Sequence, residues 1–390
     1  MKKILVFLLI AILLTGCAPL QQLPPTEATE LQFEPATMPE PETEGPTEQE
    51  TEPKPAITQL PMVAVSVPHT IETITSDNGD VIFRKTTQSM HLTMQDPDVA
   101  DKIILDFLNR VDRLSADEAY AREAAENANS TGSYQEAYFF DLIYNPTRID
   151  YSVMSLTGES VSYSGSSHPS RTCVAANYNM VTGDVLTLGS ILYHIDAKDT
   201  LTDLVIQHLA SISEDKHLFN GFEDTVRRRF NRDESFDEDW YFSTNGLCFY
   251  FAPYEIAPYA SGIIVAEIPY SELAGVIADE FFPPEEDVVN GDISFTFIDD
   301  ANMDQFSQIA EINIDTNGDM ILLYTTGAVR NVQLISESDN INTLFATYTL
   351  TPGDAIMIKI NTEEESTPLR LSYESGGELQ TIILDTNFFD

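Results

Sequence analysis

The feature that most constrains the fold of this chain is a change in hydrophobic periodicity near residue 287. Before this point apolar residues recur at both helical and strand spacing, and after it the helical spacing disappears. Short apolar runs then recur with turn residues between them, as at Asn317-Gly318 and Gly376-Gly377. The pattern predicts an α+β domain over residues 57–286, followed by a small all-β sandwich over residues 287–390.

The first of these regions mixes helix and strand patterns without βαβ regularity, which favours an antiparallel sheet with packed helices. Asp77-Asn78-Gly79-Asp80 lies between two apolar runs and predicts a hairpin. An apolar stripe over residues 99–114 predicts a helix, for which Asp98 is the expected N-cap. A last helix is expected to begin at Ser271 and to end before Pro283-Pro284.

Residues 18–56 are dominated by Pro, Glu and Thr and contain almost no apolar side chains. Such a segment cannot bury enough apolar surface to fold. Proline favours the extended polyproline conformation, and like charges extend the chain further. We expect a disordered stalk that acts as a passive spacer, with a proline-rich ligand for another module as the alternative.

The N-terminus predicts a signal peptide over residues 1–17. Lys2 and Lys3 precede an uncharged apolar run over residues 4–14, which is too short for a membrane-spanning helix. The following Leu14-Thr15-Gly16-Cys17 resembles the lipobox of bacterial lipoproteins. The resemblance implies acylation of Cys17 and anchoring at the extracytoplasmic face of the bacterial membrane. The alternative is an ordinary secretion signal with an incidental cysteine.

The charge balance limits the partners of this protein. The chain has 63 Asp and Glu residues against 20 Lys and Arg, for a net charge of -43. A field of this sign repels DNA and RNA, which excludes a nucleic-acid binder that works by neutralising phosphates. It attracts cationic proteins, peptides and metal ions.

Two cysteines remain in the folded regions, Cys173 and Cys248, and both lie in predicted strands. In an oxidising compartment they would form a disulfide if their Cα atoms lay within about 7 Å. The alternative of two buried, inert thiols stays open.

No catalytic motif emerges from the sequence. The six histidines have neither the H-E-x-x-H nor the H-x-x-x-H spacing that places two imidazoles on one helical face for zinc. There is no G-x-S-x-G nucleophile elbow. We therefore expect no enzymatic activity, no cofactor and no metal site.

A constellation of motifs does carry a family resemblance. Tyr163-Ser164-Gly165-Ser166-Ser167-His168-Pro169 is followed by Asn177-Tyr178-Asn179, and later by Tyr254-Glu255-Ile256-Ala257-Pro258-Tyr259-Ala260-Ser261-Gly262. Together these motifs resemble the RsiV-type extracellular domain over roughly residues 65–282. That domain occurs in membrane anti-sigma factors that sense lysozyme, and beside the catalytic domain of certain peptidoglycan deacetylases. The Gly-Ser-Ser-His segment here departs from the commoner Gly-Gly-Ala-His.

The resemblance implies a surface-tethered binding module, since neither a deacetylase domain nor a sigma-binding segment is found. Its implied binding or motif residues are Tyr163, Gly165, His168, Tyr178, Tyr254, Glu255, Tyr259 and Gly262. The aromatic members would form an amphipathic recognition surface. The alternative is that Tyr254, Pro258 and Gly262 only shape a turn and fill a core.

The expected function is non-enzymatic binding of a protein or a cell-wall glycan at the cell surface. A basic, lysozyme-like protein would fit the charge of the chain, and peptidoglycan would fit its location. A cell-wall-modifying hydrolase and a structural or assembly lipoprotein remain as alternatives.

Overall fold

The computed structural model describes residues 64–66, 69–94, 96–133, 137–231, 239–284, 286, 288–298, 319–336, 342–352, 355–360 and 368–384. All of these residues belong to one compact unit, Lys54–Asp390. The predicted signal peptide and stalk lie outside the described residues. In the part of the chain that is described, no helix is both long enough and apolar enough to cross a membrane.

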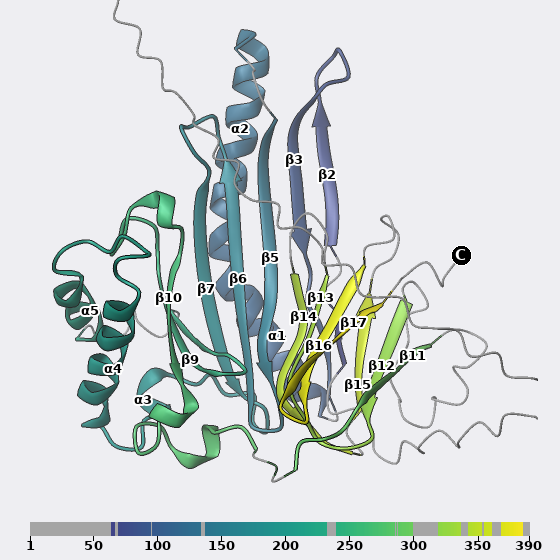
Figure 1. Cartoon of the computed structure of the whole chain (residues 1–390). Helices are drawn as coiled ribbons and strands as arrows, with labels where there is room; N and C mark the ends of the chain where they lie inside the picture. The colour runs from purple at the N-terminus through teal and green to yellow at the C-terminus, as the bar shows by residue number, and fades with distance from the viewer. Residues whose placement is uncertain are drawn as a thin grey trace, which may run out of the picture. The chain divides into compact units, whose positions relative to one another are not determined.

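A five-stranded sheet in the order β2-β3-β5-β6-β7 contains the longest strands (Figure 1). Its strands are β2 (His69–Thr75), β3 (Val81–Gln88), β5 (Tyr138–Ile149), β6 (Val153–Tyr163) and β7 (Ser170–Asn179). All neighbours are antiparallel except β3 and β5, which run parallel and are linked by a helical crossover. The predicted hairpin is confirmed: β2 and β3 pair, and Gly79 lies at φ 89° in the turn between them.

Two helices in this crossover pack against the sheet. They are α1 (Pro97–Val111) and α2 (Ala116–Thr131), joined by the 3-10 turn η1 (Asp112–Ser115). The apolar stripe of α1 is buried in the same core as the sheet. The predicted cap is wrong by two residues, because Asp96 accepts hydrogen bonds from the backbone N–H groups of Asp98 and Val99. Pro97 takes the first helical position, where its missing N–H costs no hydrogen bond.

A second layer follows in the chain, with its own core around Trp240, Phe249 and Val205. Its sheet has the order β10-β9-β8. The elements of the layer are α3 (Leu188–Ile191), α4 (Ala197–Ser211), α5 (Phe222–Phe230), β8 (Trp240–Phe242), β9 (Gly246–Phe251), η2 (Tyr259–Ser261), β10 (Ile264–Pro269), η3 (Tyr270–Glu272) and η4 (Asp279–Phe281). The predicted last helix is wrong: the chain forms only η3 and η4 there, and Gly275 between them lies at φ 74°, outside helical conformation.

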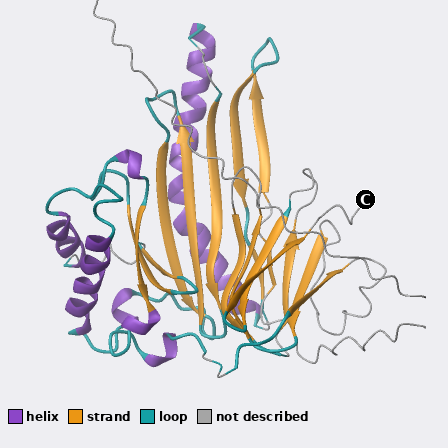
Figure 2. Ribbon diagram, viewed as in Figure 1, coloured by secondary structure: helices purple, strands orange, loops and turns teal. Residues whose placement is uncertain are grey.

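After η4 every described element is a strand, as Figure 2 shows. These strands are β11 (Ile293–Ile298), β12 (Asp319–Thr325), β13 (Val329–Ser336), β14 (Asn342–Leu350), β15 (Ala355–Ile360), β16 (Leu369–Ser375) and β17 (Glu378–Leu384). They form the sheet β14-β13-β16-β17 and most of the sheet β11-β12-β15-β1-β4. The structure is thus a strand-rich α+β fold with several sheets, as the sequence predicts at this coarser level.

Two strands from the beginning of the described chain complete the second of these sheets. They are β1 (Ala64–Ser66), which pairs parallel with β15, and β4 (His91–Thr93), which pairs antiparallel with β1. The C-terminal strands also contact the long sheet, where the Thr343 N–H donates to Asn145 Oδ1 at 3.1 Å. Strands on both sides of the predicted boundary at 286/287 therefore share one sheet and one core, and the boundary itself stays a prediction from sequence.

Candidate functional site

Three ring-bearing side chains from two distant segments meet at the surface, and we call them the aromatic cluster. His168 lies between β6 and β7, and Tyr254 and Tyr259 lie in the segment after β9. The rings of His168 and Tyr259 stack with centroids 3.8 Å apart and an interplanar angle of 23°. The Tyr254 hydroxyl lies 3.3 Å from His168 Nε2. The two motifs of the family resemblance are thus in direct contact.

The backbone holds Tyr254 in a conformation that presents its ring to solvent. Its φ of 71° lies in the left-handed region, which non-glycine residues rarely adopt. The Tyr254 N–H donates to Ala257 O at 3.0 Å, and the Ala252 N–H donates to Glu255 Oε2 at 3.0 Å. The ring remains 60% exposed. Such strain in a turn is typical of functional segments, because the surrounding structure must stabilise it.

A pocket of about 530 Å³ lies beside the aromatic cluster, and we call it the arginine pocket. Its lining comes from β7, α5 and the end of β9, and includes both chain neighbours of Tyr254. The lining residues are Arg171, Thr172, Cys173, Thr225, Arg228, Arg229, Asp239, Tyr250, Ala252, Pro253, Glu255 and Ile263. The pocket therefore combines apolar walls with several charged groups, which is the usual composition of a small-ligand site.

Ion pairs fix most of the charged groups of the arginine pocket. Arg229 pairs with Asp239 and, at 2.7 Å, with Glu255. The guanidinium of Arg229 also lies over the Phe251 ring, 4.9 Å from its centroid. These contacts hold Arg229 and both carboxylates in place without any ligand, so the wall of the pocket is preformed.

The β7 side of the pocket has a second ion pair. Arg171 Nη1 lies 2.6 Å from Glu159 Oε1 on the neighbouring strand β6. Burial raises the pKa of Glu159, and the charge of Arg171 opposes that rise. Next to this pair, burial and the charges of Glu159 and Asp239 raise the pKa of the Cys173 thiol to about 12. Cys173 is therefore a neutral thiol and a poor nucleophile at physiological pH.

The disulfide considered between Cys173 and Cys248 is absent, and both residues are free thiols. They lie on strands of different sheets, β7 and β9. The Cys173 thiol points to the carbonyl of Val174 at 3.8 Å, whereas the Cys248 thiol points to Glu267 Oε1 at 3.7 Å. Burial raises the pKa of Cys248 as well. The alternative of two inert thiols describes this structure.

The two glycines among the predicted motif residues shape the backbone. Gly165 lies at φ 83°, and a Cβ atom there would lie 2.7 Å from the hydroxyl of Tyr138. Gly262 has φ 69° and ψ −155°, a combination that is essentially restricted to glycine. Both glycines are in the turns that carry the aromatic cluster, which gives them a structural role at the site.

Two of the predicted tyrosines lie away from the surface cluster. Tyr178 is fully buried, and its hydroxyl donates to Asp106 Oδ2 of helix α1 at 2.8 Å. The ring of Tyr163 packs on that of Phe139, with centroids 6.1 Å apart. The structure therefore brings together His168, Tyr254, Tyr259 and Glu255 around one site, and it places Tyr163 and Tyr178 in packing roles.

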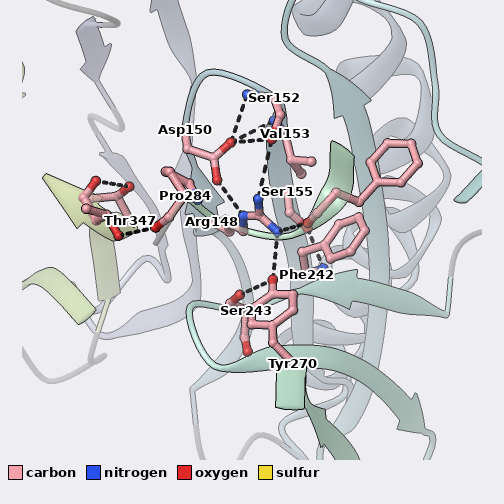
Figure 3. A network of polar contacts seen from close by, with 12 residues as sticks. Arg148, Asp150, Ser152, Val153, Ser155, Phe242, Ser243, Tyr270, Pro284 and Thr347 are labelled. Carbon is pink, nitrogen blue, oxygen red and sulfur yellow. Dashed lines mark hydrogen bonds and ion pairs between the residues drawn. The ribbon is translucent and has the colours of Figure 1, made fainter. Parts of the chain in front are cut away.

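A buried polar network connects the second layer to the long sheet (Figure 3). Arg148 of β5 has no exposed side-chain surface and pairs with Asp150 at 2.6 Å. Its Nη1 donates to the hydroxyl of Tyr270 and to Phe281 O, both at 2.7 Å. The Tyr270 hydroxyl in turn donates to Ser243 O at 2.9 Å. A fully hydrogen-bonded network of this kind fixes the position of the layer that carries the site.

A second set of hydrogen bonds attaches β8 to the long sheet. The Phe242 N–H donates to Ser155 Oγ at 2.9 Å, and Asn177 Nδ2 donates to Trp240 O at 2.9 Å. Ser155 and Asn177 are both buried. Since β8 pairs with β9, these bonds also fix β9, whose end lines the arginine pocket.

The polar groups of the site are engaged mostly with one another. His168 contacts two tyrosines and the Pro169 carbonyl, at 3.3 Å from Nδ1, rather than a carboxylate. Asp239 and Glu255 are both bound to Arg229. Among the described residues, no three His, Cys, Asp or Glu side chains gather to hold a metal ion. The arrangement can stack on a flat apolar ligand face and donate hydrogen bonds from guanidinium groups.

Sequence reasoning did not identify most of the arginine pocket. Arg171, Arg228 and Asp239 line it, and they lie far apart in sequence or outside any motif. The sequence feature that could have indicated this pocket was the run Arg227-Arg228-Arg229 on a predicted helix. Three consecutive arginines are unusual in a chain with 63 acidic and 20 basic residues.

Comparison with known proteins gives two family matches. Residues 190–271, from α3 through β10, match the family described as "Protein of unknown function (DUF3298)". The chain carries a DUF3298 domain. Residues 1–18 match the prokaryotic membrane lipoprotein lipid attachment site. The protein is therefore a lipoprotein anchored by lipid at the extracytoplasmic surface of the membrane. The narrower RsiV-type resemblance stays a prediction.

The solved structures that are similar to this chain include two proteins of the DUF3298 family. One is a member of the DUF3298 family from Bacteroides fragilis, with 17% identity and a TM-score of 0.42, covering 57% of this chain and 96% of its own. The other is a DUF3298 family protein from Pseudomonas aeruginosa, with 15% identity and a TM-score of 0.37, covering 59% of this chain and 99% of its own. No curated protein matches the chain.

Proposed function

We propose that this lipoprotein is a non-enzymatic binding module that holds a cell-wall glycan at the bacterial surface. The observation that carries the proposal is Tyr254, whose ring is 60% exposed on a backbone strained to φ 71°. Strain of this kind costs on the order of 1–3 kcal/mol, must be stabilised by the surrounding structure, and is found most often at binding and active sites. The ligand would lie across the aromatic cluster and reach into the arginine pocket.

The composition of the site supports a glycan. A sugar ring has an apolar C–H face that stacks on aromatic rings, and hydroxyls that pair with planar polar side chains. The stacked rings of His168 and Tyr259 provide an aromatic surface for the apolar face of the sugar. Arg228 supplies hydrogen-bond donors in the adjacent pocket. The lipid anchor places this site in the compartment where cell-wall glycan is found.

The absence of enzymatic activity is part of the proposal. A glycoside hydrolase would need one carboxyl group to act as a proton donor beside a second carboxylate. Here Asp239 and Glu255 share the same arginine partner, Arg229. The two carboxylates are therefore fixed on one cation, an arrangement suited to holding the wall of the pocket.

A cationic protein such as lysozyme is the second candidate ligand, and the net charge of -43 favours it. Attraction of this kind acts over the whole surface and decays over a Debye length of about 8 Å at physiological salt. This attraction would accelerate the association of a cationic protein with the chain without using the arginine pocket. A cationic ligand also has less to gain in a pocket that already contains three arginines.

Co-sedimentation of the full chain with purified peptidoglycan sacculi tests the proposal. Tyr254→Ala should weaken binding by about tenfold, since stacking on one aromatic ring contributes about 1 kcal/mol beyond the area it buries. Tyr120→Ala is the matched control, because Tyr120 is 68% exposed on α2, away from the site. Equal binding by both variants would contradict the proposed site. Binding of lysozyme but not of sacculi would favour the second candidate.

A further inference from the structure

The arginine pocket reverses the charge balance of the chain. Acidic residues outnumber basic ones 63 to 20 in the whole sequence. In the pocket lining, three arginines face two carboxylates, Asp239 and Glu255. With Glu159, which pairs with Arg171, the arginines and carboxylates are equal in number. An arginine without an ion pair in such a pocket attracts an anion locally, even where the field of the whole chain repels it, because salt screens the distant charges.

One of the three arginines, Arg228, lies outside the ion pairs of the pocket. Arg229 is occupied by Asp239 and Glu255, and Arg171 by Glu159. The Arg228 side chain is exposed, and its Nη2 donates to Thr225 Oγ1 at 3.0 Å. Of the charged groups that line the pocket, it is the one with no ion pair among the residues that the structure describes.

The position of Arg228 on α5 does not by itself explain why this arginine has no acidic partner among the described residues. Arginines are favoured in the last turn of a helix because they face the negative end of its dipole, which accounts for the run of three. Arg227, one residue earlier, pairs with Asp203 of α4 at 2.8 Å and is not part of the pocket. Two adjacent arginines with the same helix environment therefore differ in whether an acidic partner is present.

We propose that Arg228 binds a carboxylate of the ligand, so that the pocket selects carboxylate-bearing glycan, such as the acidic groups of peptidoglycan, over neutral glycan. The guanidinium group matches a carboxylate with two parallel N–H donors. Pro253 and Ile263 line the same pocket and give it an apolar wall. This inference rests on the proposed glycan-binding function and adds the chemical class of the ligand.

The experiment uses sacculi whose carboxyl groups are either native or converted to amides. Binding of the full chain should fall by about tenfold on amidated sacculi, the effect expected for losing one hydrogen-bonded charge pair. Arg228→Gln should lower binding to native sacculi by a similar factor and show no further loss on amidated sacculi. Arg227→Gln, the matched control, should behave as the unmodified chain does with both preparations.

The outcomes separate this inference from the proposed function. Equal binding of the unmodified chain to native and amidated sacculi would overturn carboxylate recognition while leaving glycan binding intact. Equal losses for Arg227→Gln and Arg228→Gln would also overturn it, since only general charge would then matter. Failure to bind native sacculi at all would overturn both proposals. Circular dichroism of each variant distinguishes lost binding from lost folding.

Discussion

Tyr254 and Gly262 lie at the two ends of the segment that contributes Tyr254 and Tyr259 to the aromatic cluster. Both have a positive φ, which most residues avoid. Tyr254 adopts a φ that is common only for glycine, and Gly262 has φ and ψ angles that a residue with a Cβ atom adopts only under strain. Between them, Ile256 and Ala257 are buried and anchor the segment. The turn thus contributes Ile256 and Ala257 to a core and exposes Tyr254, and the recognition role of this surface stays a prediction.

Gly262→Ala should destabilise the protein by roughly 1–3 kcal/mol, because its φ and ψ are strained for any residue with a Cβ atom. The free energy of unfolding, measured with urea, checks this. Gly189→Ala is the matched control. Gly189 has no positive φ, and an added Cβ would have no neighbour closer than 4.0 Å, so this variant should be neutral or slightly more stable.

Cys173 predicts a pH dependence of stability. Its pKa is raised to about 12 in the folded chain by burial, whereas an unfolded thiol ionises near a pKa of about 8.5. Between these values the unfolded chain has lost a proton that the folded chain retains, so stability falls as pH rises. Urea unfolding at pH 8 and pH 10 should show this fall, and Cys173→Ala should reduce it. An unchanged slope in the variant would assign the effect to other groups.

At the scale of elements, local patterns were predictable and long-range pairings were not. The β2–β3 hairpin follows from Asp77-Asn78-Gly79-Asp80, whose turn chemistry is contained in four residues. The last predicted helix failed because Gly275 at φ 74° interrupts it, and an apolar pattern alone does not show that conformation. The pairing of β1 with β15 joins residues almost 300 positions apart, and no periodicity in either strand specifies its partner.

The interior position of β1 has a measurable consequence. β1 lies between β15 and β4 in the sheet, so Val65→Pro removes a backbone donor from an interior strand. We expect a loss of roughly 1–3 kcal/mol in the free energy of unfolding. Asp77→Pro is the control, since Asp77 follows Ser76 in a turn closed by the Gly79 N–H donating to Ser76 O, where proline is favoured. Equal stability of both variants would mean that β1 contributes little to the fold.

In the candidate site, too, residues within one motif could be predicted from sequence, whereas residues that meet only through packing could not. His168, Tyr254, Glu255 and Tyr259 could be predicted because they lie in compact motifs. The arginine pocket could not, because Arg171 and Arg228 come from β7 and α5 and meet only through the packing of the second layer on the long sheet. That packing depends on buried groups such as Arg148, which no local pattern marks.

At the scale of the whole molecule, the lipid attachment site anchors the chain at the extracytoplasmic membrane surface. The central claim is that the protein holds a cell-wall glycan there without changing it. The most direct test incubates the full chain with soluble peptidoglycan fragments and measures the mass of the fragments recovered from the complex. We predict fragments that are retained by the protein and unchanged in mass. Recovered fragments of altered mass, or none retained, would contradict the account.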